Sequence, residues 1–201
     1  MMKVGILGGT FDPPHNGHLI IAQEVLASLH LNEVWFMPTN TPPHKADAKS
    51  RGEDRLEMVE RAIADNECFK LQPIEFERSG PSYTYDTIAI LKEKYPNAEF
   101  YFIIGADMVE YLPKWYRIDE LVHDVHFVGV KRPKFKIVSK YNIIEVEVPQ
   151  FDMSSSELRR RFKNNLNTKY FLPDAVKEYI EEKNLYGSSE SISPCKRTAD
   201  R

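Results

Sequence analysis

The segment from Lys3 to His18 constrains the fold most strongly, because a buried strand, two glycines and a helix follow one another without a break. Lys3 to Leu7 is a compact apolar run, and Gly8-Gly9 comes directly after it. Apolar residues at helical spacing then predict a helix from Asn16 or Gly17 to Leu29. Glycine lets the backbone approach a ligand closely, and a helix N-terminus offers free N–H groups to an anion. The segment therefore predicts a phosphate site after the first strand.

Short β-rich runs alternate with helical periodicity along the rest of the chain. Further strands are predicted at 33–37, 69–77, 99–104, 125–130 and 143–148, the last one half-exposed near a sheet edge. Further helices are predicted around 56–63 and at 84–95, 118–123, 155–164 and 173–184, with a long loop at 39–52. Ser82 or Thr84 could cap the helix at 84–95, and Pro173 suits a first helical turn. Strands separated by helices predict an α/β fold with a doubly wound, mostly parallel sheet and helices on both faces. Ligands then bind beyond the carboxyl ends of the strands.

Composition excludes several classes of protein. A length of 201 residues with 42% apolar and 28% charged residues suits one globular domain, which we expect at 1–187, followed by a disordered tail at 188–201. The net charge of -3 gives no reason to expect a nucleic acid or an acidic membrane as partner. Two distant cysteines, no signal-peptide pattern and no apolar stretch of about 20 residues favour a cytoplasmic location and no membrane partner.

His15 and His18 are three positions apart across the predicted helix start, so both side chains can face the same anion. A single histidine is more often a surface or core residue, but two at this spacing after Gly-Gly indicate a phosphate site. The sequence contains no GxxxxGK[ST], GxGxxG, HExxH or GxSxG motif. The sequence therefore gives no support to interpretation as a P-loop ATPase, a hydride-transfer enzyme, a zinc peptidase or a serine hydrolase.

Gly8 to His18 resembles the signature of the nucleotidyltransferase superfamily that carries an HxGH element, present here as His15-Asn16-Gly17-His18. Within it, the sequence from Lys3 to about Tyr186 resembles the bacterial nicotinate-nucleotide adenylyltransferases. These enzymes of NAD biosynthesis make deamido-NAD and pyrophosphate from nicotinate mononucleotide and ATP. The resemblance implies a Rossmann-like fold and these two nucleotides as binding partners, and it makes a homodimer plausible.

Two more segments could handle the triphosphate. Lys45, in Pro42-Pro43-His44-Lys45, is a flexible positive charge, although a loop lysine is often only solvated. The serines of the segment 154–159 precede Arg159 at a helix start, where ordinary capping is the simpler explanation. The resemblance assigns both segments to ATP, although Met153, Ser156 and Leu158 replace the family's isoleucine, threonine and isoleucine. Arg160 and Arg161 are expected on the surface. The predicted catalytic donors are His15, His18, Lys45 and Arg159.

Three segments could bind the nucleoside and the pyridine ring. Asp107 follows a strand end and could bind ribose hydroxyls or cap a helix, and Trp115 could stack on a flat ring or belong to the core. The N–H groups after Gly80-Pro81 could receive a carboxylate. With the resemblance, the predicted ATP contacts are Gly8, Gly9, Thr10, Phe11, His15, His18, Gly105, Asp107, Ser154, Ser155 and Arg159. The predicted nicotinate mononucleotide contacts are Asp12, His44, Lys45, Ser82, Tyr83, Thr84, Asp107, Tyr111 and Trp115.

The chemistry of the implied reaction needs few protein groups. A phosphomonoester has a second pKa of about 6, so the attacking phosphate needs no general base near neutral pH. Mg²⁺ is expected mainly on the ATP phosphates, with no protein side chains as metal ligands. Two alternatives remain open: a sister transferase that acts on phosphopantetheine or makes a CDP-alcohol, and a non-catalytic nucleotide sensor. The sequence leaves the preference for nicotinate over nicotinamide mononucleotide undecided.

Overall fold

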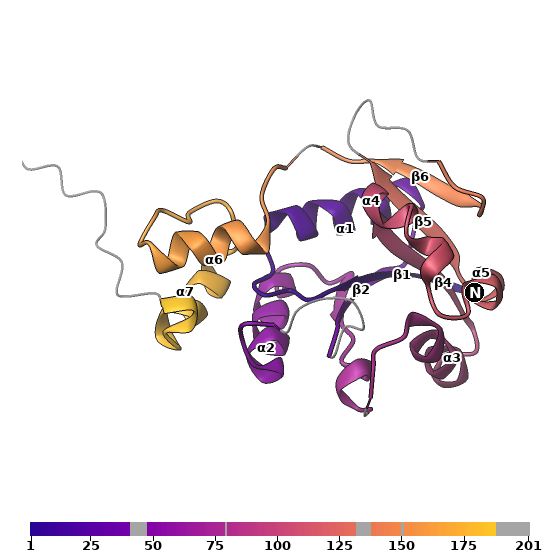
Figure 1. The fold of residues 1–201 in the computed structure, drawn as a ribbon, viewed down its shortest axis with the longest axis horizontal. Coiled ribbons are helices and arrows are strands. Elements are labelled where there is room, and N and C mark those ends of the chain that lie inside the picture. The colour runs from indigo at the N-terminus through magenta and orange to yellow at the C-terminus, as the bar shows by residue number, and fades with distance from the viewer. Residues whose placement is uncertain (41–47, 79, 132–137, 150, 188–201) are drawn as a thin grey trace, which may run out of the picture.

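The computed structural model describes residues 1–40, 48–78, 80–131, 138–149 and 151–187. Its centre is a parallel sheet, which Figure 1 shows with helices packed around it. The strands described are β1 (Met2–Gly9), β2 (Glu33–Pro38), β3 (Phe69–Leu71), β4 (Ala98–Gly105), β5 (His126–Lys131) and β6 (Ile143–Glu147). Their order is β3-β2-β1-β4-β5-β6, so the chain winds outward from β1 to one edge and then from β4 to the other. The predicted doubly wound sheet is confirmed, with β6 at an edge as expected.

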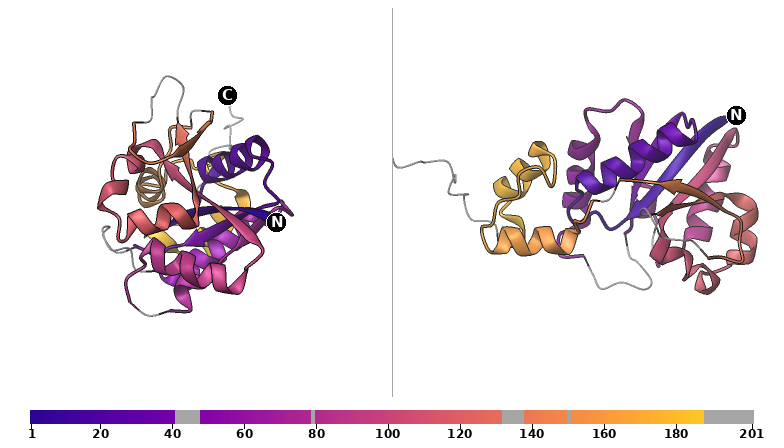
Figure 2. Two further views of the ribbon diagram at one scale, coloured as in Figure 1. Left: turned by 90° about the vertical axis from the view of Figure 1, so that its right-hand side faces the viewer. Right: turned by 90° about the horizontal axis from the view of Figure 1, so that it is seen from above.

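Helices cover both faces of this sheet, as the two views of Figure 2 show. The α-helices described are α1 (Asn16–Ser28), α2 (Gly52–Ile63), α3 (Thr84–Lys94), α4 (Ala106–Val109), α5 (Ile118–Asp124), α6 (Ser155–Lys163) and α7 (Asp174–Glu182). Short 3₁₀ turns are η1 (Ile74–Phe76), η2 (Leu112–Lys114) and η3 (Leu185–Gly187). One core contains buried residues of α1 and α2, and the other contains buried residues of α3 and α5. The predicted α/β class, with helices on both faces, is confirmed.

Successive side chains of each strand point to opposite faces of the sheet, and this alternation produces the two cores. In β1, Ile6 belongs to the core beneath α3 and α5, and its neighbour Leu7 belongs to the core beneath α1 and α2. Phe102 and Ile103 divide in the same way in β4. Successive side chains of a strand point to opposite faces, and burying each one contributes about 1.5–3 kcal/mol. A strand buried on both sides therefore appears in the sequence as a continuous apolar run.

Three details differ from the sequence predictions. The strand predicted at 69–77 ends at Leu71, because Pro73 has no N–H group to continue a ladder and the chain turns into η1. Tyr83, and neither Ser82 nor Thr84, is the N-cap residue of α3, and it makes no side-chain capping bond. Pro173 is the N-cap residue of α7 with extended backbone, so it precedes the first helical turn.

The last two helices extend the fold beyond the sheet. Figure 1 shows α6 and α7 together at one end of the molecule, with α7 beside α2. The Tyr179 hydroxyl donates a hydrogen bond to Oδ1 of Asp54 at 2.9 Å, which joins α7 to α2. The tail predicted at 188–201 lies outside the described residues. Among the described helices, none has the length and apolar character needed to cross a membrane.

Candidate active site

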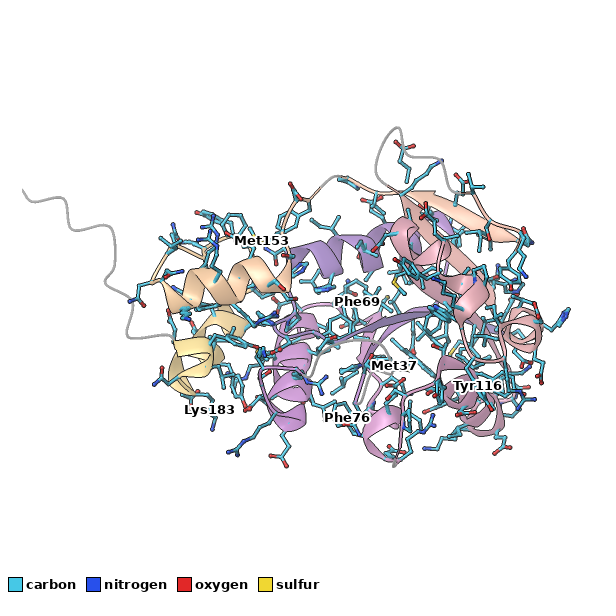
Figure 3. The ribbon with its side chains drawn as sticks, viewed as in Figure 1. Met37, Phe69, Phe76, Tyr116, Met153 and Lys183 are labelled. Carbon is cyan, nitrogen blue, oxygen red and sulfur yellow. The ribbon has the colours of Figure 1, made fainter. Side chains whose placement is uncertain are left out.

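The carboxyl ends of β1 and β4 open into a cavity of about 330 Å³. Gly8 and Gly9 line it from β1, Gly105 from β4, and His18 from α1. Met37 and Tyr116, both labelled in Figure 3, also line it. The order of the strands reverses between β1 and β4, and this is the point at which open α/β sheets bind ligands. The topology and the cavity therefore identify the same place.

His15 and His18 lie together at the start of α1, as their spacing predicts. Their rings are stacked with centroids 3.8 Å apart, and the backbone N–H of His15 donates to Nδ1 of His18 at 3.1 Å. Because this nitrogen accepts a hydrogen bond, the neutral His18 ring carries its proton on Nε2. Phe11 packs edge-on against the same ring at 4.9 Å, with its own side chain buried in the core. His18 is thus an oriented donor in the wall of the cavity.

His15 supports His18 from a buried position. Burial lowers the pKa of His15 to about 4, so its ring is neutral near neutral pH. Its Nδ1 atom is buried and has no hydrogen-bond partner among the described residues. A Cβ atom at Gly17 would lie 2.9 Å from Phe151 Cδ1 and 3.0 Å from the His15 ring. The glycine of the HxGH element therefore leaves the room that the His15 ring occupies.

Asp12 belongs to a network of protein groups. The residue is 2% exposed, and its carboxylate accepts hydrogen bonds from the Lys49 N–H at 2.6 Å, the Ser50 hydroxyl at 2.5 Å and the Tyr186 hydroxyl at 2.6 Å. These donors come from the chain before α2 and from η3 at the end of the described chain. Asp12 does not line the cavity, although it was predicted to contact the acceptor nucleotide.

The serine-rich segment forms the start of α6 and is fastened to the phosphate loop. Ser154 is the N-cap residue, and its side chain accepts from the Glu157 N–H at 3.2 Å. The Ser155 hydroxyl donates to the Pro13 carbonyl at 2.9 Å, and Arg159 Nη1 donates to the Asp12 carbonyl at 2.7 Å. The predicted capped helix start is therefore present, and the structure also places Arg159 against the phosphate loop. Arg160 and Arg161 both pair with Glu157 instead.

Arg55 was not among the predicted site residues, and it joins the loops at the cavity edge. It lies on α2 and is 3% exposed, and its Nη1 donates to the carbonyls of Thr10 at 3.1 Å and Thr39 at 2.6 Å. Its guanidinium carbon lies 5.3 Å from the centre of the Phe76 ring. Helical spacing could have revealed it, because Arg55 is four positions before the core residue Val59. An arginine on the buried face of a helix indicates that it has polar partners in the interior.

Glu75 was also not identified, although it lines the cavity. It is 3% exposed, Oε2 accepts from the Asn40 N–H at 3.2 Å, and Oε1 accepts from the Thr87 hydroxyl at 3.3 Å. Burial raises its pKa, and a hydrogen bond with Ser82 opposes that change. Glu75 thus connects the chain after β2 with the start of α3. These contacts are distant in sequence, and no local pattern indicated them.

The aromatic side of the cavity is built from α3 and the segment after η2. Ser82, Tyr83, Thr84 and Trp115 all line the cavity. The Trp115 ring stands edge-on to Phe102 and Phe127, with centroids 5.8 and 6.0 Å away. Two of its neighbours thus belong to the core, while Trp115 itself also lines the cavity. The tryptophan predicted to stack on the pyridine ring and the helix start predicted to bind its carboxylate therefore line the same cavity as the phosphate loop.

Gly105 lines the cavity, whereas Asp107 and Tyr111 do not. Gly105 is the N-cap residue of α4, and a Cβ atom there would lie 2.5 Å from Asp107 Oδ1. Asp107 is exposed in the first turn of this short helix, so it is not the N-cap residue. Tyr111 is 53% exposed, and the Lys114 ammonium group lies 5.1 Å from the centre of its ring.

Comparisons with known proteins agree on one family. The family model described as cytidylyltransferase-like matches residues 6–161. The nicotinate-nucleotide adenylyltransferase of Bacillus subtilis is 53% identical over 189 residues, which cover 94% of this chain and 100% of that protein. A Geobacillus thermodenitrificans protein named probable nicotinate-nucleotide adenylyltransferase is 57% identical over 201 residues, or 100% of this chain and 93% of that one. This chain belongs to the nicotinate-nucleotide adenylyltransferase family.

A solved structure shares the fold of this adenylyltransferase. Plasmodium falciparum nicotinic acid mononucleotide adenylyltransferase complexed with NaAD superposes with a TM-score of 0.79 and 23% sequence identity, covering 94% of this chain and 99% of that one. The structure therefore has the Rossmann-like fold that the sequence resemblance implied. The relatives of 53% and 57% identity show that the chain is an enzyme of the nucleotidyltransferase class.

The structure of this family member brings together most of the predicted site. The predicted residues that line the cavity are Gly8, Gly9, Thr10, His18, Ser82, Tyr83, Thr84, Gly105 and Trp115. Those next to them in the phosphate loop or at the start of α6 are Phe11, His15, Ser154, Ser155 and Arg159. Asp12, Asp107 and Tyr111 do not line the cavity. His44 and Lys45 lie outside the described residues.

Proposed function

We propose that this chain transfers AMP from ATP to nicotinate mononucleotide, giving deamido-NAD and pyrophosphate. The observation that carries this proposal is the single cavity that joins His18 and the glycines of β1 to Trp115 and the start of α3. The first part offers donors for a triphosphate, and the second offers an aromatic surface and helix N–H groups for a ring carboxylate. The names of the relatives in Bacillus and Geobacillus support the same substrates.

In the proposed reaction, an oxygen of the mononucleotide 5′-phosphate attacks the α-phosphorus of ATP. A new P–O bond forms, and the bond to the oxygen between the α- and β-phosphates breaks, which releases pyrophosphate. The second pKa of a phosphomonoester is about 6, so the nucleophile is a dianion near neutral pH and no general base is required. The barrier lies in bringing anions together and in stabilising the charge on the phosphoryl oxygens.

Four donors would carry out this stabilisation. His18 can donate from Nε2, because its Nδ1 already accepts the His15 N–H. Arg159 lies at the start of α6, next to the phosphate loop. His15 and Lys45 complete the proposed set, with His15 as a neutral group. Donors held in position before the reaction need no rearrangement in the transition state, which is why their orientation matters.

The start of α3 would bind the nicotinate carboxylate. The first N–H groups of a helix have no partners within the helix, and they favour an anion. Thr84 begins this helix, and the side chain of Tyr83, its N-cap residue, makes no capping bond. A carboxylate could accept from these groups through both oxygens, whereas an amide would direct its NH₂ group toward N–H donors. The proposed site therefore favours nicotinate over nicotinamide.

We propose Mg²⁺ as the accompanying cation, bound mainly through the ATP phosphates. Across the described ranges, no group of three or more His, Cys, Asp or Glu side chains could hold a metal ion. A cation that keeps most of its waters and binds phosphate oxygens fits this donor set, because Mg²⁺ uses few protein ligands at such sites. When bound, it would neutralise phosphate charge.

The single domain at 1–187, the homodimer and the cytoplasmic location remain predictions.

The test is a pyrophosphate-release assay with ATP, Mg²⁺ and a panel of acceptors. The panel contains nicotinate mononucleotide, nicotinamide mononucleotide and phosphopantetheine, with a parallel reaction of CTP and an alcohol phosphate. We expect pyrophosphate and deamido-NAD in equal amounts with nicotinate mononucleotide. Turnover with phosphopantetheine or CTP alone would support a sister transferase. Tight ATP binding without pyrophosphate from any acceptor would support a nucleotide sensor.

A further inference from the structure

Tyr186 lies in η3, far in sequence from the proposed site. Its hydroxyl donates to Oδ1 of Asp12 at 2.6 Å, across 174 positions of the sequence. The same hydroxyl lies 3.3 Å from Ser50 Oγ, and the ring packs against Phe162 of α6 with centroids 6.1 Å apart. The end of the described chain is therefore attached to the phosphate loop.

Asp12 connects this tyrosine to Arg159. The Asp12 carbonyl accepts from Arg159 Nη1 at 2.7 Å, and the same nitrogen lies 4.0 Å from the Asp12 carboxylate. Arg159 Nη2 donates to Ser156 Oγ at 3.0 Å. A guanidinium group has five N–H donors, so these contacts fix its plane and still allow it to bind phosphate oxygens. The position of Arg159 therefore depends on the position of Asp12.

Tyr186 is suited to act as a permanent donor to Asp12. Burial, together with the negative charge of Asp12, raises the pKa of Tyr186 well above its usual range. The hydroxyl therefore keeps its proton at any pH at which an enzyme is assayed. A hydrogen bond to a charged acceptor is among the stronger ones in proteins. Loss of the Tyr186 hydroxyl would leave one carboxylate oxygen of Asp12 with only the Ser50 hydroxyl as its described donor.

We propose that Tyr186 is a positioning residue, which holds Asp12 so that Arg159 is oriented toward the ATP phosphates. This inference rests on the proposed function, in which Arg159 binds the triphosphate. The C-terminal turn then sets the affinity for ATP without touching it. The simpler explanation is that Tyr186 only fastens the C-terminal helices to the rest of the fold, and the experiment must separate these two roles.

Tyr179 provides a matched control on the preceding helix. It is 6% exposed, and its hydroxyl donates to Oδ1 of Asp54 at 2.9 Å. This contact also joins the C-terminal helices to the rest of the fold, but through α2 instead of the phosphate loop. Tyr179→Phe and Tyr186→Phe each remove one hydroxyl and keep the ring. They should therefore have similar effects on stability if both residues only fasten the C-terminal helices.

The two variants are compared in the full chain by thermal unfolding and by kinetics with ATP and nicotinate mononucleotide varied separately. We expect both to lower Tm, and only Tyr186→Phe to raise the KM for ATP. The expected rise is about tenfold, the lower end of what the loss of a group that orients a metal ligand costs at metal sites. The KM for nicotinate mononucleotide should change by less than about twofold in both variants. An unchanged KM for ATP in Tyr186→Phe, or an equal rise in Tyr179→Phe, would overturn the inference.

A double-mutant cycle tests whether the effect passes through Arg159. ATP affinity is measured by calorimetry for wild type, Tyr186→Phe, Arg159→Ala and the double variant. If Tyr186 acts through Arg159, Tyr186→Phe has no further effect once Arg159 is alanine, whereas independent effects would multiply. Multiplying effects would contradict the inference.

Calorimetry also separates this inference from the proposed function. A wild type that binds ATP but makes no deamido-NAD would contradict the function and leave the cycle measurable. If Tyr186→Phe does not fold, Ser50→Ala replaces it in the same cycle, because it removes the other donor to the same carboxylate oxygen. The inference is supported if Ser50→Ala weakens ATP binding in the wild-type background and has no further effect in the Arg159→Ala background. An unchanged ATP affinity in Ser50→Ala overturns it.

Discussion

The His15 backbone N–H donates to Nδ1 of His18 at 3.1 Å, and the two rings are stacked with centroids 3.8 Å apart. The hydrogen bond sets the tautomer of His18, and the stacking sets the orientation of its ring. One histidine of the HxGH element thus lines the cavity, and the other holds it in place. Glycine between Asn16 and His18 suits this arrangement, since a Cβ atom there would lie 3.0 Å from the His15 ring and would force that ring to shift.

His18→Ala should lower kcat by at least about 10²-fold, because removal of one oriented donor to the developing charge has this effect in other enzymes. The measurement is steady-state pyrophosphate release at saturating ATP and nicotinate mononucleotide. His126→Ala is the control, because His126 is exposed at the start of β5 and pairs with Glu99. The assignment of His18 fails if its alanine variant turns over at the wild-type rate.

The buried ring of His15 should make stability depend on pH. Its pKa is about 4 in the folded protein, against 6.5 for an unperturbed histidine, so the unfolded chain binds more protons between these values. Stability is then fully present above pH 6.5 and is lost as the pH falls through 4. Between pH 7.5 and 4.5, the free energy of unfolding should fall by about 2 kcal/mol less in His15→Asn than in wild type. Urea unfolding at both pH values measures this difference, and equal losses would show that His15 is not buried as described.

Arg55→Met should destabilise the protein by about 3 kcal/mol, because it leaves buried backbone carbonyls without their charged donor. The carbonyls of Thr10 and Thr39 are the acceptors that lose their partner. Arg61→Met is a control on the same helix, since Arg61 is a partly exposed residue that pairs with Glu57, and an exposed ion pair contributes little to stability. Chemical unfolding compares the two variants, and equal changes would contradict the role given to Arg55.

Trp115→Ala should raise the KM for nicotinate mononucleotide by about tenfold, because stacking of a base on an aromatic side chain contributes about 1–3 kcal/mol. The KM for ATP should change little. Trp115→Phe keeps an aromatic face and should recover most of the affinity. Initial rates with each substrate varied in turn distinguish these effects. A larger change in the KM for ATP would mean that the ring serves the other nucleotide.

Most of the fold could be predicted because its signals are local. The apolar run before Gly8, the helical spacing after Asn16 and the edge-strand pattern at 143–148 each depend on neighbouring residues, and the structure confirms them. The strand predicted at 69–77 was wrong after Leu71, because the apolar pattern continues past Pro73 while the backbone turns.

The site was predicted less completely because several of its contacts are distant in sequence. His18 and Trp115 were found from local motifs and line the cavity. Glu75 lies in a short turn without periodicity, and its partner Asn40 is 35 positions away. Asp12 was assigned to a ligand because it belongs to the motif, yet donors from distant positions, including Tyr186, surround its carboxylate. Such pairings follow from the folded arrangement of the chain.

Whether this chain adenylylates nicotinate mononucleotide is tested most directly by comparing kcat/KM for nicotinate mononucleotide and nicotinamide mononucleotide at saturating ATP and Mg²⁺. The start of α3 and Trp115 line one cavity, so a ring that carries a carboxylate should be preferred. We predict a preference of at least about 10²-fold for nicotinate mononucleotide, because the amide would leave N–H donors unpaired and introduce a donor of its own. Equal values, or a preference for nicotinamide mononucleotide, would contradict the account.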